Sequence, residues 1–500
     1  MPETDVIVSP DPEELAPRRL WSLREDVHVE LPDPGGDVLL HSRWQTERVV
    51  RPDRTTREAL RRMRLGPVSL RNVLDGAEDG AEERLSRALH GIQHLIVRSI
   101  GMTGSQSPLL SFVPMSPRAS LDLPRVTPDR PVRLSRFAHL HSEGRGFELE
   151  SPLSLFRVTA HRGAGAELLA SLGWTATPEE LLKTVPLPRA VVLELLAHLL
   201  AAGLVITDED RGAEPESALA EPTFAEDSDP VLATWSPVDL LFHTRSTTGR
   251  HDHDFGATFT HALRLVPEPA VRPLPDGPRF PLPAVRGTTA DDPAPLADAL
   301  DAGPRPRGPG PGGELTTTQI GELLHRSLRV RSMSVDPTAP AAYQVSDRPY
   351  TSISGSHPLE AYLTVTRCAG LPPGIFHYDP AGHQLTLVNR NEADLAEFLT
   401  CIRTAGGLTE APPATITLTA RFSRVTWKFS ALGYALVLRD TGAALQTLTL
   451  AATVMGLTTA VLGNSDADLA PRCVGLDWRS EAPVGQLIID PSHAPAKGRP

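Results

Sequence analysis

A loop of small hydroxyl residues lies directly before an apolar segment in the C-terminal half of the chain. Residues 348–360 read RPYTSISGSHPLE, and this loop contains Ser352, Ser354, Gly355 and His357. A glycine and short hydroxyl side chains allow backbone N–H and O–H groups to approach a polar heteroaromatic ring closely. The same composition is typical of an ordinary turn. The pattern alone leaves a ring-binding loop and a plain turn as equal alternatives.

Motifs for other common chemistries are missing or weak. The sequence contains no P-loop, no H-E-x-x-H and no G-x-S-x-G motif. Residues 251–254 read HDHD, which could bind a metal, but such a run beside a Gly/Arg turn is more often a solvated loop. The three cysteines have no spacing typical of metal ligands. We therefore expect no metal site and give hydrolases and metalloenzymes a low weight.

The overall composition excludes several classes of function. A formal net charge of −12 argues against a general nucleic-acid binder and against a basic membrane-surface protein. No run of about 18 apolar residues is present to span a bilayer. The acidic first residues lack the basic and apolar regions of a signal peptide. We expect a soluble cytoplasmic protein that binds neither nucleic acid nor membrane.

The elements that must position the loop are predicted by patterns from Thr316 onwards. Thr316 and Gln319 form a capping-box pattern before an amphipathic helix. Residues 360–388 read as a buried strand followed by a hairpin, and Asp440 is predicted to open a helix that ends near Met455. Strands and helices interleave without a strict β-α-β rhythm. We expect an α+β fold with a mixed sheet flanked by helices.

The N-terminal half predicts two copies of one small α+β unit, in residues 1–105 and 130–206. In each copy, short extended runs precede amphipathic helices, which in the first copy include residues 81–99. The second copy ends in a helix–turn–helix pattern and an extended run that resembles a winged helix. Its last helix lacks a row of arginines, so we favour peptide docking or a structural role over DNA binding.

Two irregular segments separate the structured regions. Residues 207–232 are acidic and rich in Pro and Ala, which predicts a linker. Residues 266–314 contain proline throughout, and we place this segment inside a C-terminal domain that spans residues 233–500.

The C-terminal half resembles thiazole/oxazole oxidases of the SagB type, which are nitroreductase-like flavin enzymes. The resemblance rests on "RPYTSISGSHPLEAYLTVTRCAGLPPGIFHYDPAGHQLTLV", on "RVTWKFSALGYALVLRDTG" and on "MGLTTAVLGNSDADLAPRCVGL". It covers about 235–490 and is strong across 345–490. In the first segment, Thr351 stands where the family usually has proline. The N-terminal half is similar to the family's winged-helix extension in outline only.

The resemblance implies a cofactor and the residues that bind it. Members of this family bind FMN at a homodimer interface and oxidise a peptide thiazoline or oxazoline to the azole. By motif position, Ser352, Ser354, Gly355 and His357 would lie along the isoalloxazine ring. Gly463 would approach the flavin through its backbone.

The phosphate-binding motif of the family is poorly matched. Arginine binds phosphate in a bidentate manner, and the family has the motif R-R-S-x-R after a short helix. Here residues 303–307 read GPRPR, so only Arg307 fits the motif. Arg305 and Arg499 are alternatives that the sequence does not rank.

Lys428 is the residue that the resemblance points to as the catalytic base. The family's W-K-Y is Trp427-Lys428-Phe429 here, without the phenol, on what we expect to be a strand. The chain has only three lysines among 49 basic residues, so a lysine at this position is unusual. A lysine amine accepts a proton at neutral pH only if burial lowers its pKa. The alternative is a structural lysine whose stem covers the indole.

Three functions follow from this resemblance. The first is an FMN-dependent azoline dehydrogenase that acts on a ribosomal precursor peptide, with the N-terminal units binding the leader. The second keeps the flavin but oxidises or reduces another peptide side chain or a dehydroamino acid. The third is a catalytically weak scaffold that binds peptide or a cyclodehydratase partner, which the altered phosphate motif and the missing tyrosine favour.

Overall fold

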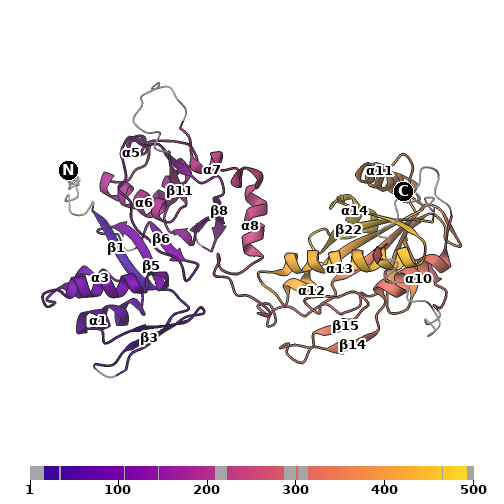
Figure 1. Cartoon of the computed structure of the whole chain (residues 1–500), viewed down its shortest axis with the longest axis horizontal. Coiled ribbons are helices and arrows are strands. Elements are labelled where there is room, and N and C mark those ends of the chain that lie inside the picture. Colours follow the sequence, from indigo (N-terminus) through magenta and orange to yellow (C-terminus); the bar gives the residue numbers. More distant parts are fainter. Residues whose placement is uncertain are drawn as a thin grey trace, which may run out of the picture. The chain divides into compact units, whose positions relative to one another are not determined.

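The chain folds as two compact units, Met1–His253 and Asp254–Pro500 (Figure 1). The structure is a computed structural model that describes residues 16–32, 35–105, 107–144, 146–208, 222–285, 300–301, 314–463 and 465–491. Each unit has its own sheet and hydrophobic cores. Within the described ranges, every helix is too short or too polar to cross a bilayer.

A six-stranded antiparallel sheet forms the centre of the N-terminal unit. Its strands lie in the order β1 (Pro17–Leu23), β5 (Ile96–Met102), β6 (Leu110–Pro114), β10 (Phe156–Ala160), β9 (Gly146–Glu150) and β8 (His139–Glu143). Two smaller sheets consist of β2 (His28–Glu30), β3 (Val38–His41) and β4 (Thr46–Val49), and of β11 (Val205–Thr207) with β7 (Val132–Leu134).

Three strands followed by three helices occur twice in this unit. The helices are α1 (Arg54–Met63), α2 (Arg71–Leu74) and α3 (Ala81–Gly91), then α4 (Gly163–Ser171), α5 (Pro178–Thr184) and α6 (Arg189–Ala201). The first run begins with β2, β3 and β4, and the second with β8, β9 and β10. This element order agrees with an internal repeat. The winged-helix nature of the units and their limits at 1–105 and 130–206 stay predictions.

The predicted helix over residues 81–99 is wrong in its second half. Helix α3 ends at Gly91, and a single turn of 3-10 helix (Gln93–Leu95) leads into strand β5. The segment Ile96-Val97 is β-branched, and β-branched residues favour strands. Apolar spacing continued past the helix end because one face of β5 is buried as well.

The last part of the predicted linker and the segment after it pack on the N-terminal unit. They contain α7 (Ala225–Ser228), a 3-10 turn (Leu232–Thr234) and α8 (Pro237–Arg245). Glu226 accepts hydrogen bonds from Ser135 Oγ and from Arg136 N, both at 2.6 Å. Arg245 forms an ion pair with Glu150. These contacts place the division of the chain after His253, whereas the sequence placed the start of the C-terminal domain at residue 233.

A seven-stranded sheet forms the centre of the C-terminal unit. Its order is β12 (Arg279–Pro281), β19 (Gln384–Asn389), β18 (Gly374–Asp379), β16 (Leu359–Val365), β20 (Ala414–Arg421), β22 (Glu481–Asp490) and β21 (Thr458–Leu462). All six pairings are antiparallel, so this sheet is not mixed as the sequence predicted. Two short pairs lie apart from it, β13 (Leu315–Thr316) with β17 (Cys368–Ala369) and β14 (Ser332–Val335) with β15 (Gln344–Asp347).

Helices cover both faces of this sheet. Helices α10 (Thr317–Leu328) and α13 (Gly433–Val454) share the main core on one face (Figure 1). Helices α11 (Glu392–Gly406) and α14 (Leu469–Val474) pack over the other face. The short helix α12 (Phe422–Thr426) continues β20.

Local patterns placed most of these helices correctly. The capping box of Thr316 and Gln319 is confirmed at the start of α10. The predicted opening of a helix at Asp440 is wrong, because α13 begins at Gly433 and Asp440 lies inside it, fully buried. A buried carboxylate inside a helix needs partners from another segment, and those partners belong to the predicted ring-binding loop.

Candidate active site

Asp440 holds the loop that precedes strand β16. Ser352 Oγ donates a hydrogen bond to Asp440 Oδ2 at 2.5 Å, and the backbone N–H of Ile353 donates to Oδ1 at 3.0 Å. Burial raises the pKa of Asp440, and the two hydrogen bonds oppose that shift. Loop and helix are therefore joined by a buried carboxylate that the sequence interpretation missed. The only sequence signal was an acidic residue at an interior position of a long apolar helix.

The four loop residues predicted to contact a cofactor lie together. Ser352 Oγ accepts a hydrogen bond from the His357 N–H at 3.3 Å, and Ser354 Oγ accepts one from the Ser356 N–H at 3.0 Å. Gly355 has a φ of 65° and His357 a φ of 43°. A left-handed backbone is unusual for histidine and marks a strained loop that its surroundings must hold. No atom lies within 4 Å of where a Gly355 side chain would begin.

Residues 352–357 of this loop carry no charged side chain at neutral pH. Burial lowers the pKa of His357 to about 4, so its imidazole is neutral at pH 7. Its Nε2 lies 3.3 Å from the Tyr350 carbonyl oxygen, while Nδ1 is buried without a partner among the described residues. An unsatisfied buried acceptor is rare in proteins and often marks a functional site. A neutral loop with open space at Gly355 fits an uncharged heteroaromatic ring.

Arg424 connects this loop to two other segments. Its guanidinium is fully buried and donates to the carbonyl oxygens of Glu268 at 2.6 Å, Gln344 at 2.8 Å and Ser356 at 2.7 Å. It also lies 4.5 Å from the ring centroid of Tyr343. Burial lowers the pKa of Arg424 to about 10. Arg424 remains charged at neutral pH and fixes the loop through three backbone contacts.

Lys428 lies in the turn after α12, not on a strand as predicted. Its Nζ lies 2.8 Å from Asp336 Oδ2, and each side chain is only 12% exposed. The rings of Phe259, Tyr343 and Phe429 surround the amine at 5.6–5.9 Å. The hydrogen bond from Lys428 lowers the pKa of Asp336 to about 2. The amine is therefore buried, as the base hypothesis requires, but it faces a carboxylate as well as apolar rings.

Lys428 and the loop lie at the same end of the sheet. The end of β20 pairs with the beginning of β16, and α12 continues from β20. Tyr343 Oη donates to the Arg424 carbonyl oxygen at 2.5 Å, and its ring stacks on Trp427 at 5.3 Å. Arg424 in turn contacts the loop at Ser356. This series of contacts connects the turn of Lys428 to the predicted ring-binding loop.

Of the other predicted cofactor contacts, Gly463 is described and Arg307 is not. Gly463 follows β21, whose last residue Leu462 pairs with Gln486 in the middle of β22. Through Thr417 of β20, Gln486 is level with Tyr362 of β16, and the chain leaves β21 towards the end of the sheet at which β16 begins. Strand β21 lies three strand positions from β16, or about 14 Å at ~4.8 Å per strand. Arg307, like Arg305 and Arg499, lies outside the described residues.

A buried charged network lies on the face of the seven-stranded sheet that is turned away from α10 and α13. The sequence interpretation also missed this network. Glu360 lies 2.9 Å from His377 Nε2 and 3.0 Å from Arg421 Nε, and all three residues are buried. These partners lower the pKa of Glu360 to about 2 despite its burial. The Glu360 carboxylate stays ionised at neutral pH and supports the first residues of β16, directly after the loop.

No group of three or more His, Cys, Asp or Glu side chains in the described ranges could hold a metal ion. In the HDHD run, Asp252 forms ion pairs with Arg24 and Arg157 instead. His251 is buried and Asp252 half-buried, whereas His253 and Asp254 are exposed, so the solvated loop that was favoured fits only the second half of the run.

Replacing Asp440 with asparagine should loosen the loop without unfolding the protein. An amide keeps the size of the carboxylate but has one acceptor oxygen, whereas Ser352 and the Ile353 N–H donate to different oxygens of Asp440. One of the two hydrogen bonds is therefore lost, and the other is no longer charge-assisted. We expect faster hydrogen–deuterium exchange in residues 350–358 and about tenfold weaker cofactor binding. Asp468→Asn, an exposed change elsewhere in the unit, is the control. Unchanged exchange and binding in D440N would contradict the anchoring role.

Two protein families match the chain. The Cyanobactin oxidase ThcOx family matches residues 132–252, and the Nitroreductase family matches residues 320–489. The first match ends at the division between the two units, and the second spans the loop, Lys428 and Gly463. No curated protein matches the chain.

Several solved structures are similar to the C-terminal part of the chain. A candidate nitroreductase from Anabaena variabilis is 17% identical with a TM-score of 0.35, and covers 50% of this chain and 46% of its own. A candidate nitroreductase from Ralstonia eutropha is 20% identical with a TM-score of 0.32. The match covers 46% of this chain and 100% of the Ralstonia chain. A chain of the E. coli microcin synthetase McbBCD complex with truncated pro-MccB17 bound is 20% identical with a TM-score of 0.30. The match covers 51% of this chain and 92% of that chain. The chain thus spans less than half of the first relative. At these TM-scores the interpretation rests on the two matched families.

Proposed function

We propose that this chain, a nitroreductase-family oxidoreductase with a cyanobactin oxidase domain ahead of it, oxidises azolines in a ribosomal precursor peptide. The two domains together indicate azoline oxidation in the biosynthesis of modified ribosomal peptides. The finer proposal is an FMN-dependent dehydrogenase that converts thiazolines or oxazolines to thiazoles or oxazoles.

One observation supports the position of the active site. A strained, uncharged loop anchored by Asp440 lies at the same end of the sheet as Lys428, inside the segment that matches the Nitroreductase family. Nitroreductase-family proteins typically bind FMN, which when bound accepts a hydride. We propose that Ser352, Ser354, Gly355 and His357 hold the flavin ring.

Two further residues complete the proposed cofactor site. Gly463 would approach the ring through its backbone, because it lies at the same end of the sheet as the loop. Arg307 remains the proposed phosphate ligand by its motif position alone.

Azoline oxidation removes one proton and one hydride from adjacent atoms of the ring. We propose that Lys428 Nζ takes the proton, because it is the basic side chain that the contacts of Arg424 and Tyr343 connect to the loop. The ion pair with Asp336 opposes this role at rest, because Nζ donates its hydrogen bond to the carboxylate. The amine must leave Asp336 before it can take a proton from the substrate.

The test is the fate of a defined azoline peptide. The full-length protein should be yellow, release FMN on denaturation, and convert a thiazoline-containing precursor peptide to a product lighter by two hydrogens. An intact thiazoline in the presence of bound flavin would contradict azoline oxidation and favour another side chain as substrate. A colourless protein that still binds the peptide would favour the scaffold function.

The sequence placed the leader-binding candidate in the second unit, residues 130–206. We propose instead that the precursor's leader binds in the first unit, at the free edge of β4. Strand β4 pairs only with β3 among the described strands, whereas β10, the third strand of the second run, pairs with β9 and with β6. An extended peptide could therefore pair with β4 as an additional strand, in the way that β6 pairs with β10. A groove of about 380 Å3 lies between β4 and α3 at this edge.

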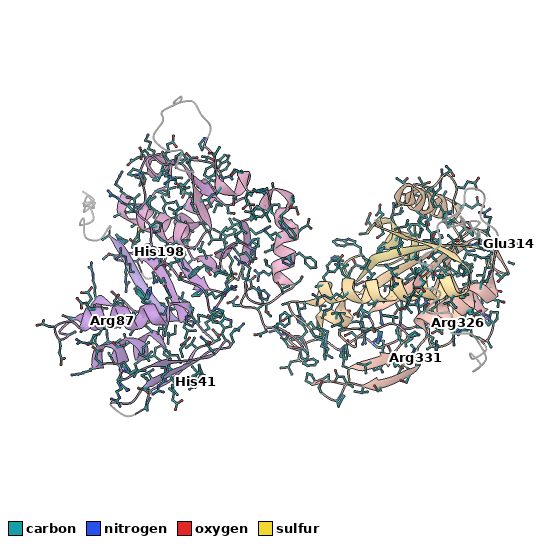
Figure 2. All side chains as sticks on the ribbon, in the orientation of Figure 1. His41, Arg87, His198, Glu314, Arg326 and Arg331 are labelled. Carbon is teal, nitrogen blue, oxygen red and sulfur yellow. The ribbon has the colours of Figure 1, made fainter. Side chains whose placement is uncertain are left out.

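The charge of this groove favours an acidic leader. The groove contains four arginines against two carboxylates, the lining charges being Arg48, Arg51, Arg84, Arg87, Glu47 and Asp53. Arg48 pairs with Asp37 and Arg84 with Asp53. Arg87 extends from α3 without a partner among the described residues (Figure 2).

Reversing the charge of Arg87 should weaken leader binding. We expect Arg87→Glu to bind an acidic leader on the order of tenfold more weakly at low salt, with a smaller loss at high salt. Fluorescence anisotropy of a labelled leader with the full-length protein measures this. Arg390→Glu carries the same charge change in the other unit and should bind normally. An equal loss of leader binding in both variants would indicate a general effect of charge. It would contradict the proposal that the leader binds in this groove.

We also propose a homodimer and a cyclodehydratase partner. Ile353 in the loop is 61% exposed, and Tyr434 and Leu438 on α13 are 48% and 38% exposed. Exposed apolar side chains beside a site often mark an interface. These residues suit a second copy of the C-terminal unit.

A further inference from the structure

The six-stranded sheet of the N-terminal unit has one apolar face and one polar face. The apolar face packs in the main core of the unit through residues such as Ile100, Phe112 and Val158. On the other face, Ser99 of β5, Ser111 of β6 and Thr159 of β10 lie directly opposite one another in register. Hydroxyl groups at the centre of a six-stranded sheet are unusual for a face that is covered by protein, and are typical of one that contacts water or a ligand.

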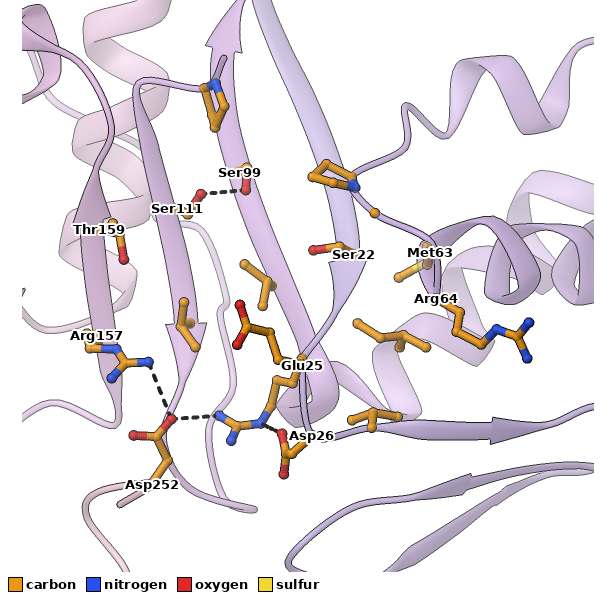
Figure 3. Close-up of a pocket in the computed structure, with 18 of the residues that line it drawn as sticks. Ser22, Glu25, Asp26, Met63, Arg64, Ser99, Ser111, Arg157, Thr159 and Asp252 are labelled. Atoms are coloured by element: carbon orange, nitrogen blue, oxygen red, sulfur yellow. Dashed lines mark hydrogen bonds and ion pairs between the residues drawn. The ribbon is translucent and has the colours of Figure 1, made fainter. Parts of the chain in front are cut away.

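A cavity of about 870 Å3 lies over this polar face (Figure 3). Its walls are the turn after β1, the segment after α1 and residues 252–253, so it lies wholly within the N-terminal unit. The volume falls within the range of about 300–1,000 Å3 that is usual for ligand sites. The cavity is separate from the proposed leader groove at β4, with which it shares no lining residue.

The arginines of this cavity are already balanced by carboxylates. Asp252 lies 3.2 Å from Arg24 and 3.6 Å from Arg157, and Asp26 lies 2.9 Å from Arg24 (Figure 3). Glu148 lies 3.6 Å from Arg157. These pairs leave no net positive charge on this wall, so an anionic ligand gains little there.

Glu25 is the charged group that points into the cavity without a partner. Its carboxylate is directed into the space over the strands, and it makes no hydrogen bond or ion pair with any described residue (Figure 3). Arg64, at the rim, points away from it (Figure 3). A cationic group in the cavity would therefore meet an unneutralised carboxylate.

The floor offers hydrogen bonds of both kinds. Ser111 Oγ lies 2.7 Å from Ser99 Oγ and 2.8 Å from His161 Nε2. Thr159 Oγ1 has no partner among the described residues. A hydroxyl group can both donate and accept, which suits the N–H and C=O groups of a peptide backbone.

We propose that this cavity binds an extended polar peptide segment that carries one arginine or lysine, with its cation paired to Glu25. The floor crosses five neighbouring strands from β1 to β9, which is about 19 Å at ~4.8 Å per strand. An extended peptide of about six residues spans that distance at ~3.3 Å per residue. The inference rests on the proposed function in one respect, namely that the segment belongs to the precursor peptide outside the leader.

The test uses labelled hexapeptides and the full-length protein. The probe is acetyl-Gly-Ser-Arg-Ser-Gly-Ser with a C-terminal fluorophore, and the matched probes carry citrulline or glutamate in place of arginine. We expect the arginine probe to bind at least about fivefold more tightly than the citrulline probe, because citrulline keeps the shape of arginine without its charge. Equal binding of these two probes, tighter binding of the glutamate probe, or no binding up to about 1 mM would overturn the proposal.

Two variants place the binding within the cavity. Glu25→Gln should remove the preference for the arginine probe over the citrulline probe. Thr159→Val should weaken the binding of both probes about threefold and leave that preference unchanged. Glu83→Gln, an exposed change on α3 that lines no described cavity, is the matched control. An arginine preference that survives in Glu25→Gln would overturn the site.

The outcome is independent of whether azolines are the substrate. Arg87→Glu should leave hexapeptide binding unchanged, because Arg87 lines the other groove. Hexapeptide binding without azoline turnover would retain the peptide site and reject the proposed reaction. Azoline turnover without hexapeptide binding would retain the reaction and reject this site.

Discussion

Replacing Lys428 with alanine is expected to lower azoline turnover by a factor on the order of 10²–10⁴, the usual contribution of a general base. Flavin content should stay unchanged, because Lys428 contacts Asp336 and aromatic rings and not the loop itself. Lys428→Arg should be nearly as inactive, because a guanidinium keeps the charge but cannot act as a base at neutral pH. Single-turnover kinetics with a thiazoline peptide measure both variants.

The arginine variant separates the two possible roles of Lys428. Wild-type turnover in Lys428→Arg would contradict a base and assign the amine to electrostatic positioning. Loss of flavin in Lys428→Ala would place the residue in the cofactor site. Lys183→Ala, a change of an exposed lysine in the other unit, is the control.

Asp336 holds the amine of Lys428 at rest. The hydrogen bond from Lys428 lowers the pKa of Asp336 to about 2, so this carboxylate is ionised at neutral pH. Asp336→Asn keeps the size of the side chain but removes the ion pair at 2.8 Å, so we expect faster azoline turnover at pH 7 with unchanged flavin content, because the amine is no longer held by the carboxylate. Turnover equal to that of the wild type would contradict a role of this ion pair in the reaction.

The sequence indicated Lys428 but not its environment. Lysine is rare in this chain and the residue lies in a recognisable motif, so a single sequence was enough to select it. Asp336 lies 92 residues earlier in the chain and has no periodicity or motif that connects it to Lys428. The contact arises because the hairpin of β14 and β15 meets the turn after α12. A pairing of this kind depends on tertiary structure, which local patterns do not encode.

The errors in the predicted fold also arise because tertiary structure is not encoded in local patterns. Apolar periodicity continued from α3 into β5 because both elements bury one face. Asp440 looked like a helix start because acidic residues favour the first turn of a helix, yet it anchors a loop 88 residues earlier in the chain. The sheet was expected to be mixed because strands and helices alternate, and the pairing of strands is not determined by that alternation. The capping box of α10, in contrast, depends on two residues three positions apart and was predicted correctly.

Arg424 should be the most sensitive structural residue of the site. Arg424→Met removes donors from three backbone carbonyl oxygens, a buried one at Ser356 and part-buried ones at Glu268 and Gln344. Leaving a buried acceptor unpaired costs about 1–3 kcal/mol, and packing of the guanidinium is lost as well, so we expect the C-terminal unit to lose about 3 kcal/mol of stability. Arg424→Lys should recover only part of this loss, because an ammonium on a flexible stem cannot reproduce the planar fork of a guanidinium.

Hydrogen–deuterium exchange in the full-length protein tests this prediction. The segments that Arg424 connects, residues 343–357 and 266–270, should exchange faster in Arg424→Met, and flavin should be released at lower urea concentration than in the wild type. Arg439→Met, an exposed change on α13, provides the matched control and should behave as the wild type. If Arg424→Met lost stability while residues 343–357 kept their protection, the carbonyl contacts would not be what holds the loop. The loss would then come from packing against Tyr343, and Arg424→Lys, which lacks the planar stacking group, would be equally destabilised.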